Sequence, residues 1–133
     1  MSFPAGAVAP SLDDFAAMAE RAFAQLPQPF RDLAAESVIR IDDFADEDIL
    51  TSMGIEDAFE LTGLYQGVDL SRGSVFEAAQ PSMIFLYRRP ILDEWAERGD
   101  VPLEELVTHV LVHEIGHHFG LSDDDIDRVE DEA

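Results

Sequence analysis

The stretch HVLVHEIGHHFGLSDDD, residues 109–125, contains all four histidines of this 133-residue chain and ends in a run of aspartates. Apolar residues recur at helical spacing between positions 106 and 111, which predicts a long helix with a buried face. We expect this helix to begin near Pro102, a residue suited to a first turn, and to continue to about Phe119. This predicted helix carries every histidine of the chain, so we interpret the other segments in relation to it.

The HEIGH segment places His113 and His117 four positions apart, with Glu114 directly after the first histidine. On an α-helix such histidines lie one above the other, about 6 Å apart along the axis, and can point at one metal ion. Glu114 lies about 100° around the helix, where it reaches a water on that metal but is too oblique to be a third ligand. This arrangement is typical of two ligands plus a general base. The alternative is a helix whose histidines only form hydrogen bonds in the core.

A third ligand is needed, because catalytic zinc usually has three protein ligands and one open position. Gly120 can adopt the left-handed conformation that ends a helix and turns the chain back. We therefore expect Asp123 to supply the third ligand, with Asp124 or Asp125 as alternatives if the turn is wider. All three aspartates are also compatible with a helix cap or a solvated loop.

The other two histidines are weaker candidates. His109 lies one turn before His113 and is expected to pack or to support that residue rather than to bind metal directly. His118 points about 100° away from His117, which favours an ordinary core or surface histidine.

The remaining chain predicts helices at both ends and a few strands between them, the pattern of an α+β fold. Ser11 is a good N-cap for a first helix that Pro27 stops. The predicted strands lie at 37–43 and 83–87, and shorter helical pieces lie at 29–36, 46–60 and 91–97. We expect residues 1–10 to be a flexible N-terminal segment and residues 11–133 to form a single domain.

The composition is strongly acidic, with 29 acids, 8 bases and a net charge of −21. Such a surface repels nucleic acid and anionic membranes, so neither is expected as a partner. The chain has no cysteine, no signal-peptide pattern and no apolar run long enough to span a bilayer, which favours a cytoplasmic, monomeric protein, with weak oligomerisation left open. The acidity itself is typical of a solvated surface.

Several segments together resemble a known family, the small bacterial zincin-like metallopeptidases often called minimal zincins. The resemblance covers the chain from about 11 to 126. It rests on LPQPF at 26–30, GLYQG at 63–67, IFLYRRP at 84–90 and HEIGHHFGLSDDD at 113–125.

The resemblance implies a minimal zincin-like α+β fold, in which helices pack on a small mixed or antiparallel sheet and the active-site helix is near the C-terminus. It implies Zn²⁺ on His113, His117 and Asp123, with Glu114 as the base. The function it favours is a zinc-dependent metallopeptidase-like hydrolase, acting on a peptide or protein substrate through a zinc-activated water. The alternative is a catalytically inactive metal-binding scaffold that serves as a protein-interaction module. Glu114 favours hydrolysis, because structural zinc needs no base beside it.

The strand at 83–87 is the candidate for substrate contact. In zincins the substrate lies along an edge strand above the motif helix, so we expect a peptide to add to this strand. Met83, Phe85 and Tyr87 are then the candidate substrate-binding residues. Tyr87 is also compatible with simple packing of a strand aromatic in the core.

Overall fold

One mixed sheet organises the part of the chain that the structure describes. This computed structural model describes residues 9–35, 37–66, 82–120, 124–126 and 128. Within these ranges three strands, β1 (Val38–Asp42), β2 (Gly63–Gln66) and β3 (Met83–Tyr87), form a sheet in the order β1-β3-β2. β3 pairs parallel with β1 and antiparallel with β2. The expected α+β architecture with a small mixed sheet is confirmed.

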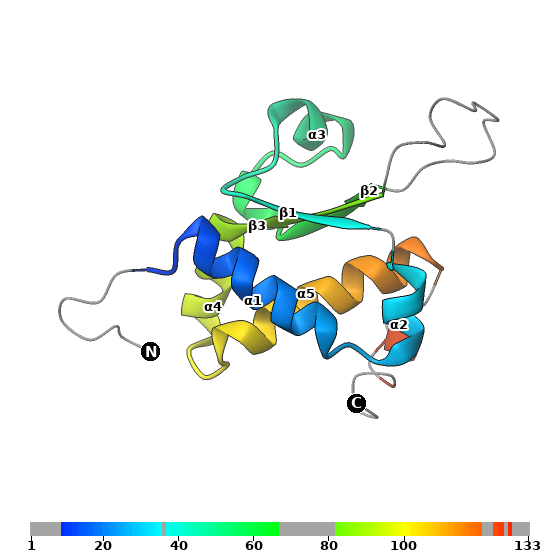
Figure 1. Cartoon of the computed structure of the whole chain (residues 1–133). Coiled ribbons are helices and arrows are strands. Elements are labelled where there is room, and N and C mark those ends of the chain that lie inside the picture. The colour runs from blue at the N-terminus through cyan, green and yellow to red at the C-terminus, as the bar shows by residue number, and fades with distance from the viewer. Residues whose placement is uncertain (1–8, 36, 67–81, 121–123, 127, 129–133) are drawn as a thin grey trace.

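Helices cover the two faces of this sheet unequally (Figure 1). One face packs on α1 (Leu12–Ala24), α2 (Gln28–Leu33), α4 (Arg88–Arg98) and α5 (Leu103–His118). The other face lies beneath α3 (Glu47–Ser52), which is followed by the short 3₁₀ turn η1 (Ala58–Glu60). Among the helices described, none combines the length and apolar character needed to cross a bilayer.

β3 is the central strand because it can be buried on both faces. Ile84 and Leu86 are fully buried in the main core, which also contains the apolar side of α5. Phe85 and Tyr87 point to the opposite face and pack in a second, smaller cluster beneath α3. A continuous apolar run such as MIFLY is typical of a strand buried on both faces, whereas an edge strand more often alternates.

Local signals fix most of the helix ends. Ser11 caps α1 reciprocally, since its Oγ accepts from the Asp14 N–H at 3.1 Å while its own N–H donates to Asp14 Oδ2 at 2.8 Å. Gly99 ends α4 with φ of 76°, and Gly120 follows α5 with φ of 84°. The left-handed conformation expected at Gly120 is therefore present. It is one that a side chain would disfavour.

α4 begins earlier than expected, at Arg88 rather than at 91. Pro90 lies in the first turn of α4, where its missing N–H leaves no hydrogen bond unmade. Arg88, the first residue of α4, is mostly buried. Its guanidinium donates to the Pro10 carbonyl at 2.6 Å and to Asp43 at 3.0 Å, and so ties the start of α4 to two distant segments.

The chain returns to α5 after the helix ends. Ile126 is fully buried in the main core. A Cβ built on Gly116 would lie 2.6 Å from Cγ1 and 2.7 Å from Cδ1 of Ile126. The absence of a side chain at Gly116, directly before His117, therefore allows the returning segment to pack against the motif helix.

This packing predicts whether a Gly116→Ala substitution stabilises or destabilises the fold. In an open helix alanine is preferred over glycine by about 1 kcal/mol, but here the added methyl overlaps Ile126, and overpacking costs roughly 1–3 kcal/mol. We expect the free energy of unfolding to fall, measured by denaturant titration. Adding Ile126→Ala should make the Gly116→Ala step stabilising in the double-mutant cycle. Stabilisation by Gly116→Ala alone would show that Ile126 does not pack there.

Candidate functional site

Three histidines form a row along α5. The ring centroids of His113 and His117 are 5.5 Å apart with their planes at 90°, and those of His109 and His113 are 4.1 Å apart. Two imidazoles bound to one zinc ion at about 2 Å from each nitrogen have centroids roughly 5 Å apart. His113 is half-buried and His117 is exposed. The His113–His117 pair is thus spaced to share a metal ion that solvent can reach.

Glu114 lies between α5 and the sheet. Burial raises its pKa from 4.5 to about 7, while the nearby His117 and a backbone hydrogen bond from Tyr65 lower it and so offset part of that shift. Tyr65 belongs to β2, so the strand itself holds this carboxylate in place. A carboxyl group with a pKa near 7 can accept and release a proton at neutral pH.

The close approach of β2 to α5 depends on Gly63. A Cβ built at this position would lie 2.8 Å from Val110 Cγ1 and 3.2 Å from Glu114 Cγ. Any side chain here would push α5 or Glu114 away. GLYQG at 63–67 contributes to the family resemblance, but no role for Gly63 or Tyr65 is predicted from the sequence. A glycine inside a short strand is a signal of close backbone approach and could have indicated this contact.

The end of the motif helix is braced by aromatic rings. His118 stacks on Tyr65 with centroids 4.0 Å apart, and Phe119 meets the same ring edge-on at 5.8 Å. The Tyr65 hydroxyl lies 2.7 Å from Ser37 Oγ. Burial lowers the pKa of His118, which favours the neutral imidazole in this stack. His118 thus packs against β2 and does not point with His117.

His109 opens onto a different part of the molecule. It lines a cavity of about 350 Å³ on the flank of α5, together with Leu26, Val101, Leu106 and Val112. Its ring also lies against His113. This position agrees with the packing role expected for His109.

Sequence comparison identifies the family. The sequence model of the zincin-like metallopeptidases matches residues 34–133, which include all three strands and α5. The chain belongs to this family. A comparison with curated proteins gave no match.

The donors of this zincin-like chain can be tested against the zinc ion that its family implies. His113 and His117 offer imidazoles at a suitable spacing, and Glu114 lies beside them as a base. Among the described residues, no three histidine, aspartate or glutamate side chains are grouped so as to hold a metal. The pair therefore fits as two of the three protein ligands that a catalytic zinc requires.

The third ligand stays a prediction. Asp123 lies outside the described residues. Asp124 is exposed, and Asp125 is half-buried with a carboxylate oxygen 3.8 Å from Arg128. Ile126, which packs against Gly116, fixes the end of this segment beside the motif helix.

The predicted substrate strand requires a correction. β3 is hydrogen-bonded to β1 on one side and to β2 on the other, so a peptide cannot add to it as a further strand. Phe85 and Tyr87 also point away from α5, into the cluster beneath α3, and Met83 shares their face because side chains alternate along a strand. The pairing prediction is wrong. Any substrate contact by Met83, Phe85 or Tyr87 would occur on the opposite face of the sheet.

The raised pKa of Glu114 predicts a pH effect on the stability of the metal-free protein. Because the folded pKa of about 7 exceeds the usual 4.5, the unfolded chain loses this proton first as pH rises. Stability should therefore fall between about pH 4.5 and 7, by no more than roughly 1.4 kcal/mol per pH unit from this group. Glu114→Gln should remove that component and leave the protein more stable at pH 8, by on the order of 1 kcal/mol. Parallel stability curves for the two proteins across this range would contradict the assignment.

Proposed function

We propose that this chain is a zinc-dependent hydrolase of peptide bonds, with His113 and His117 as two metal ligands and Glu114 as the general base. The observation that carries the proposal is the position of Glu114. It is half-buried, held by the Tyr65 backbone, and directly follows the first of two histidines that can share a metal. A site built only to bind metal has no need for such a carboxylate.

The residues of the site have distinct tasks in this proposal. A bound zinc would lower the pKa of its water to about 7 and polarise the scissile carbonyl. Glu114 takes the proton of the attacking water and passes it to the leaving amine. The hydrogen bond from Tyr65 fixes the carboxylate for this transfer. Val110 and Gly63 pack closely beside it, which limits the water that reaches its inner side.

The edge strand that lies against α5 is β2, and it supports the proposed placement of the substrate. Tyr87 N–H donates to the Thr62 carbonyl at 2.9 Å. Given the antiparallel register, the main-chain groups of Gly63 and Tyr65 then point away from β3. The Tyr65 N–H is used by Glu114. Within the part of the chain that the structure describes, the Gly63 N–H and the carbonyls of both residues are left for an extended peptide.

The deciding experiment measures metal content and peptide cleavage together. We expect one zinc per chain in the wild type and in Glu114→Gln, and an affinity at least about tenfold weaker in His117→Ala, which lacks one ligand. Cleavage of a peptide library by the zinc-loaded proteins should fall at least 100-fold in Glu114→Gln, about the contribution of a general base. Asp123→Asn, with Asp124→Asn and Asp125→Asn as matched controls, assigns the third ligand.

Two outcomes would contradict the proposal. A wild-type protein that takes up no zinc from excess metal at neutral pH would exclude the site. Zinc binding without cleavage of any library peptide would leave a metal-binding scaffold that acts as an interaction module.

We expect a Gly63→Ala substitution to reduce turnover without reducing zinc binding. The added methyl would overlap Val110 and crowd Glu114, and the three atoms nearest to it include none from His113 or His117. We expect zinc stoichiometry to be kept and kcat to drop by at least about tenfold, because small displacements of a catalytic group are costly. Val110→Ala in the same chain removes the closest overlap and should restore part of the activity. An unchanged kcat in Gly63→Ala would show that β2 does not position the base.

A further inference from the structure

We propose that the pocket between the outer face of the sheet and α3 binds the guanidinium or ammonium group of a basic side chain in a polypeptide. The pocket has a volume of about 450 Å³. Its charged lining is Asp42, Asp43, Asp46 and Arg40, and its aromatic lining is Phe44, Phe85 and Tyr87. It lies on the sheet face opposite α5, and neither Glu114 nor a histidine is among the residues that line it.

The charge in this pocket is only partly neutralised. Asp42 lies 3.3 Å from the guanidinium of Arg40, which is 62% exposed. Asp43 is paired with Arg88 at 3.0 Å. Asp46 is the N-cap residue of α3, but its side chain makes no capping hydrogen bond. An exposed ion pair such as Arg40–Asp42 is weak and can yield to another cation.

A buried hydroxyl without a partner points to a ligand at this position. Tyr87 is 1% exposed, and within the described residues its hydroxyl is buried with no hydrogen-bond partner. Such a group costs free energy unless something bonds to it. Burial, followed by the charges of Asp42, Asp46 and Glu114, raises the pKa of Tyr87 to about 12. The phenol is therefore neutral at physiological pH and can offer its oxygen to an N–H donor.

The aromatic lining suits an organic cation better than a metal ion. The rings of Phe85 and Tyr87 are nearly parallel with centroids 6.2 Å apart. Phe44 already carries one guanidinium on its face, that of Arg89, 5.7 Å from the ring centroid. Among the residues described, the carboxylates are not grouped to chelate a metal. Aromatic faces beside carboxylates are typical of sites for ammonium and guanidinium groups.

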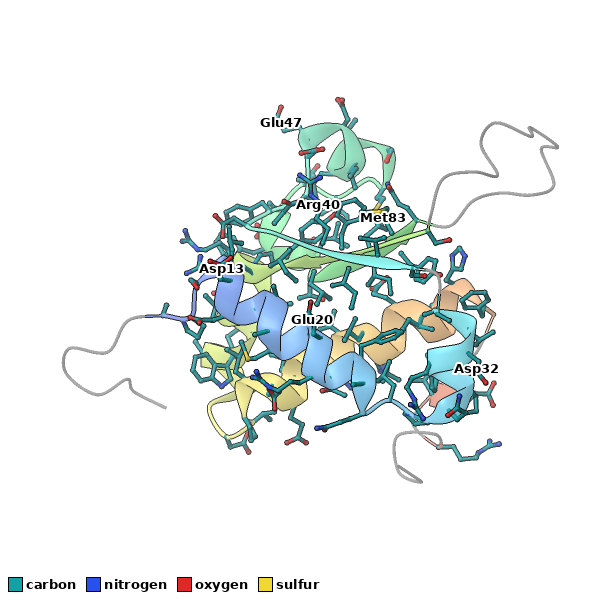
Figure 2. The ribbon with its side chains drawn as sticks, viewed as in Figure 1. Asp13, Glu20, Asp32, Arg40, Glu47 and Met83 are labelled. Atoms are coloured by element: carbon teal, nitrogen blue, oxygen red, sulfur yellow. The ribbon has the colours of Figure 1, made fainter. Side chains whose placement is uncertain are left out.

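The size of the pocket and the charge of the molecule support a basic side chain as the occupant. Arg40 and Met83 project from the sheet toward α3, whereas Glu47 lies on the outer side of α3, away from the sheet (Figure 2). The volume is within the range of small-ligand sites and exceeds what one basic side chain requires. The net charge of −21 would draw basic polypeptides toward this surface.

In the test, the metal-free full chain is titrated with N-acetyl-arginine amide as the probe, and binding is followed by NMR. The neutral isostere N-acetyl-citrulline amide is the matched ligand control. We expect saturable binding of the arginine derivative, with shifts centred on residues of this pocket, and at least about fivefold weaker binding of the citrulline derivative. Because neither zinc nor turnover is involved, failure here is distinguishable from failure of the proposed hydrolysis.

Variants separate the pocket from general electrostatics. Asp46→Asn should weaken binding about three- to tenfold. Glu47→Gln removes the same charge on the neighbouring residue, outside the pocket, and should change binding less than twofold. Arg40→Gln should tighten binding about two- to fivefold by exposing Asp42. Tyr87→Phe loses one acceptor and should weaken binding without destabilising the fold, since the deleted hydroxyl has no partner.

Four results would overturn the proposal. The first is binding of N-acetyl-arginine amide that does not saturate at millimolar concentration, and the second is equally tight binding of the citrulline derivative. The third is an equal loss of affinity in Asp46→Asn and Glu47→Gln. The fourth is a pocket that binds Ca²⁺ or a free diamine but not the arginine derivative.

Discussion

The approach of β2 to α5 at Gly63 is the contact on which the candidate site depends. It brings a strand so near to the helix that Tyr65 can bond to Glu114 through its backbone while its ring stacks on His118. The helix alone would leave Glu114 in solvent, where its pKa would stay near that of any glutamate. The strand supplies both the burial that raises the pKa and the hydrogen bond that limits the rise. The motif thus acquires its chemistry from tertiary packing rather than from its own residues.

The sequence predicted those parts of the site that belong to one helix. The spacing of His113, Glu114 and His117 follows from helical geometry, and the left-handed conformation at Gly120 follows from its lack of a side chain. These are local properties, which a single segment determines. The α+β class could also be predicted, because helix signals stand at both ends of the chain and strand signals between them. The family could be predicted from the short motifs spread along the chain.

The order of the strands could not be predicted in this way. β1 and β3 are parallel neighbours although their paired residues, such as Val38 and Met83, are 45 positions apart in the sequence. Only the assembled sheet reveals which strand has a free edge. The run MIFLY at 83–87 was interpreted as an edge strand, yet its apolar character on both faces is what a central position requires. The contacts of Gly63 and Tyr65 are long-range for the same reason. Tyr65 acts through its backbone and its ring, and Gly63 signals only that another backbone approaches, not which one.

The two faces of the sheet have become two different environments. On the α5 face, Ile84 and Leu86 join a large apolar core that fixes the motif helix. On the α3 face, the alternate residues Phe85 and Tyr87 pack in a small cluster beside an acidic segment, and this cluster buries the Tyr87 hydroxyl without a hydrogen-bond partner among the described residues. Alternate side chains of the central strand β3 pack on opposite faces of the sheet. A movement of β3 would therefore displace side chains on both faces. A basic side chain bound under α3 would therefore contact the same strand that, through its pairing with β2, holds Glu114 in place.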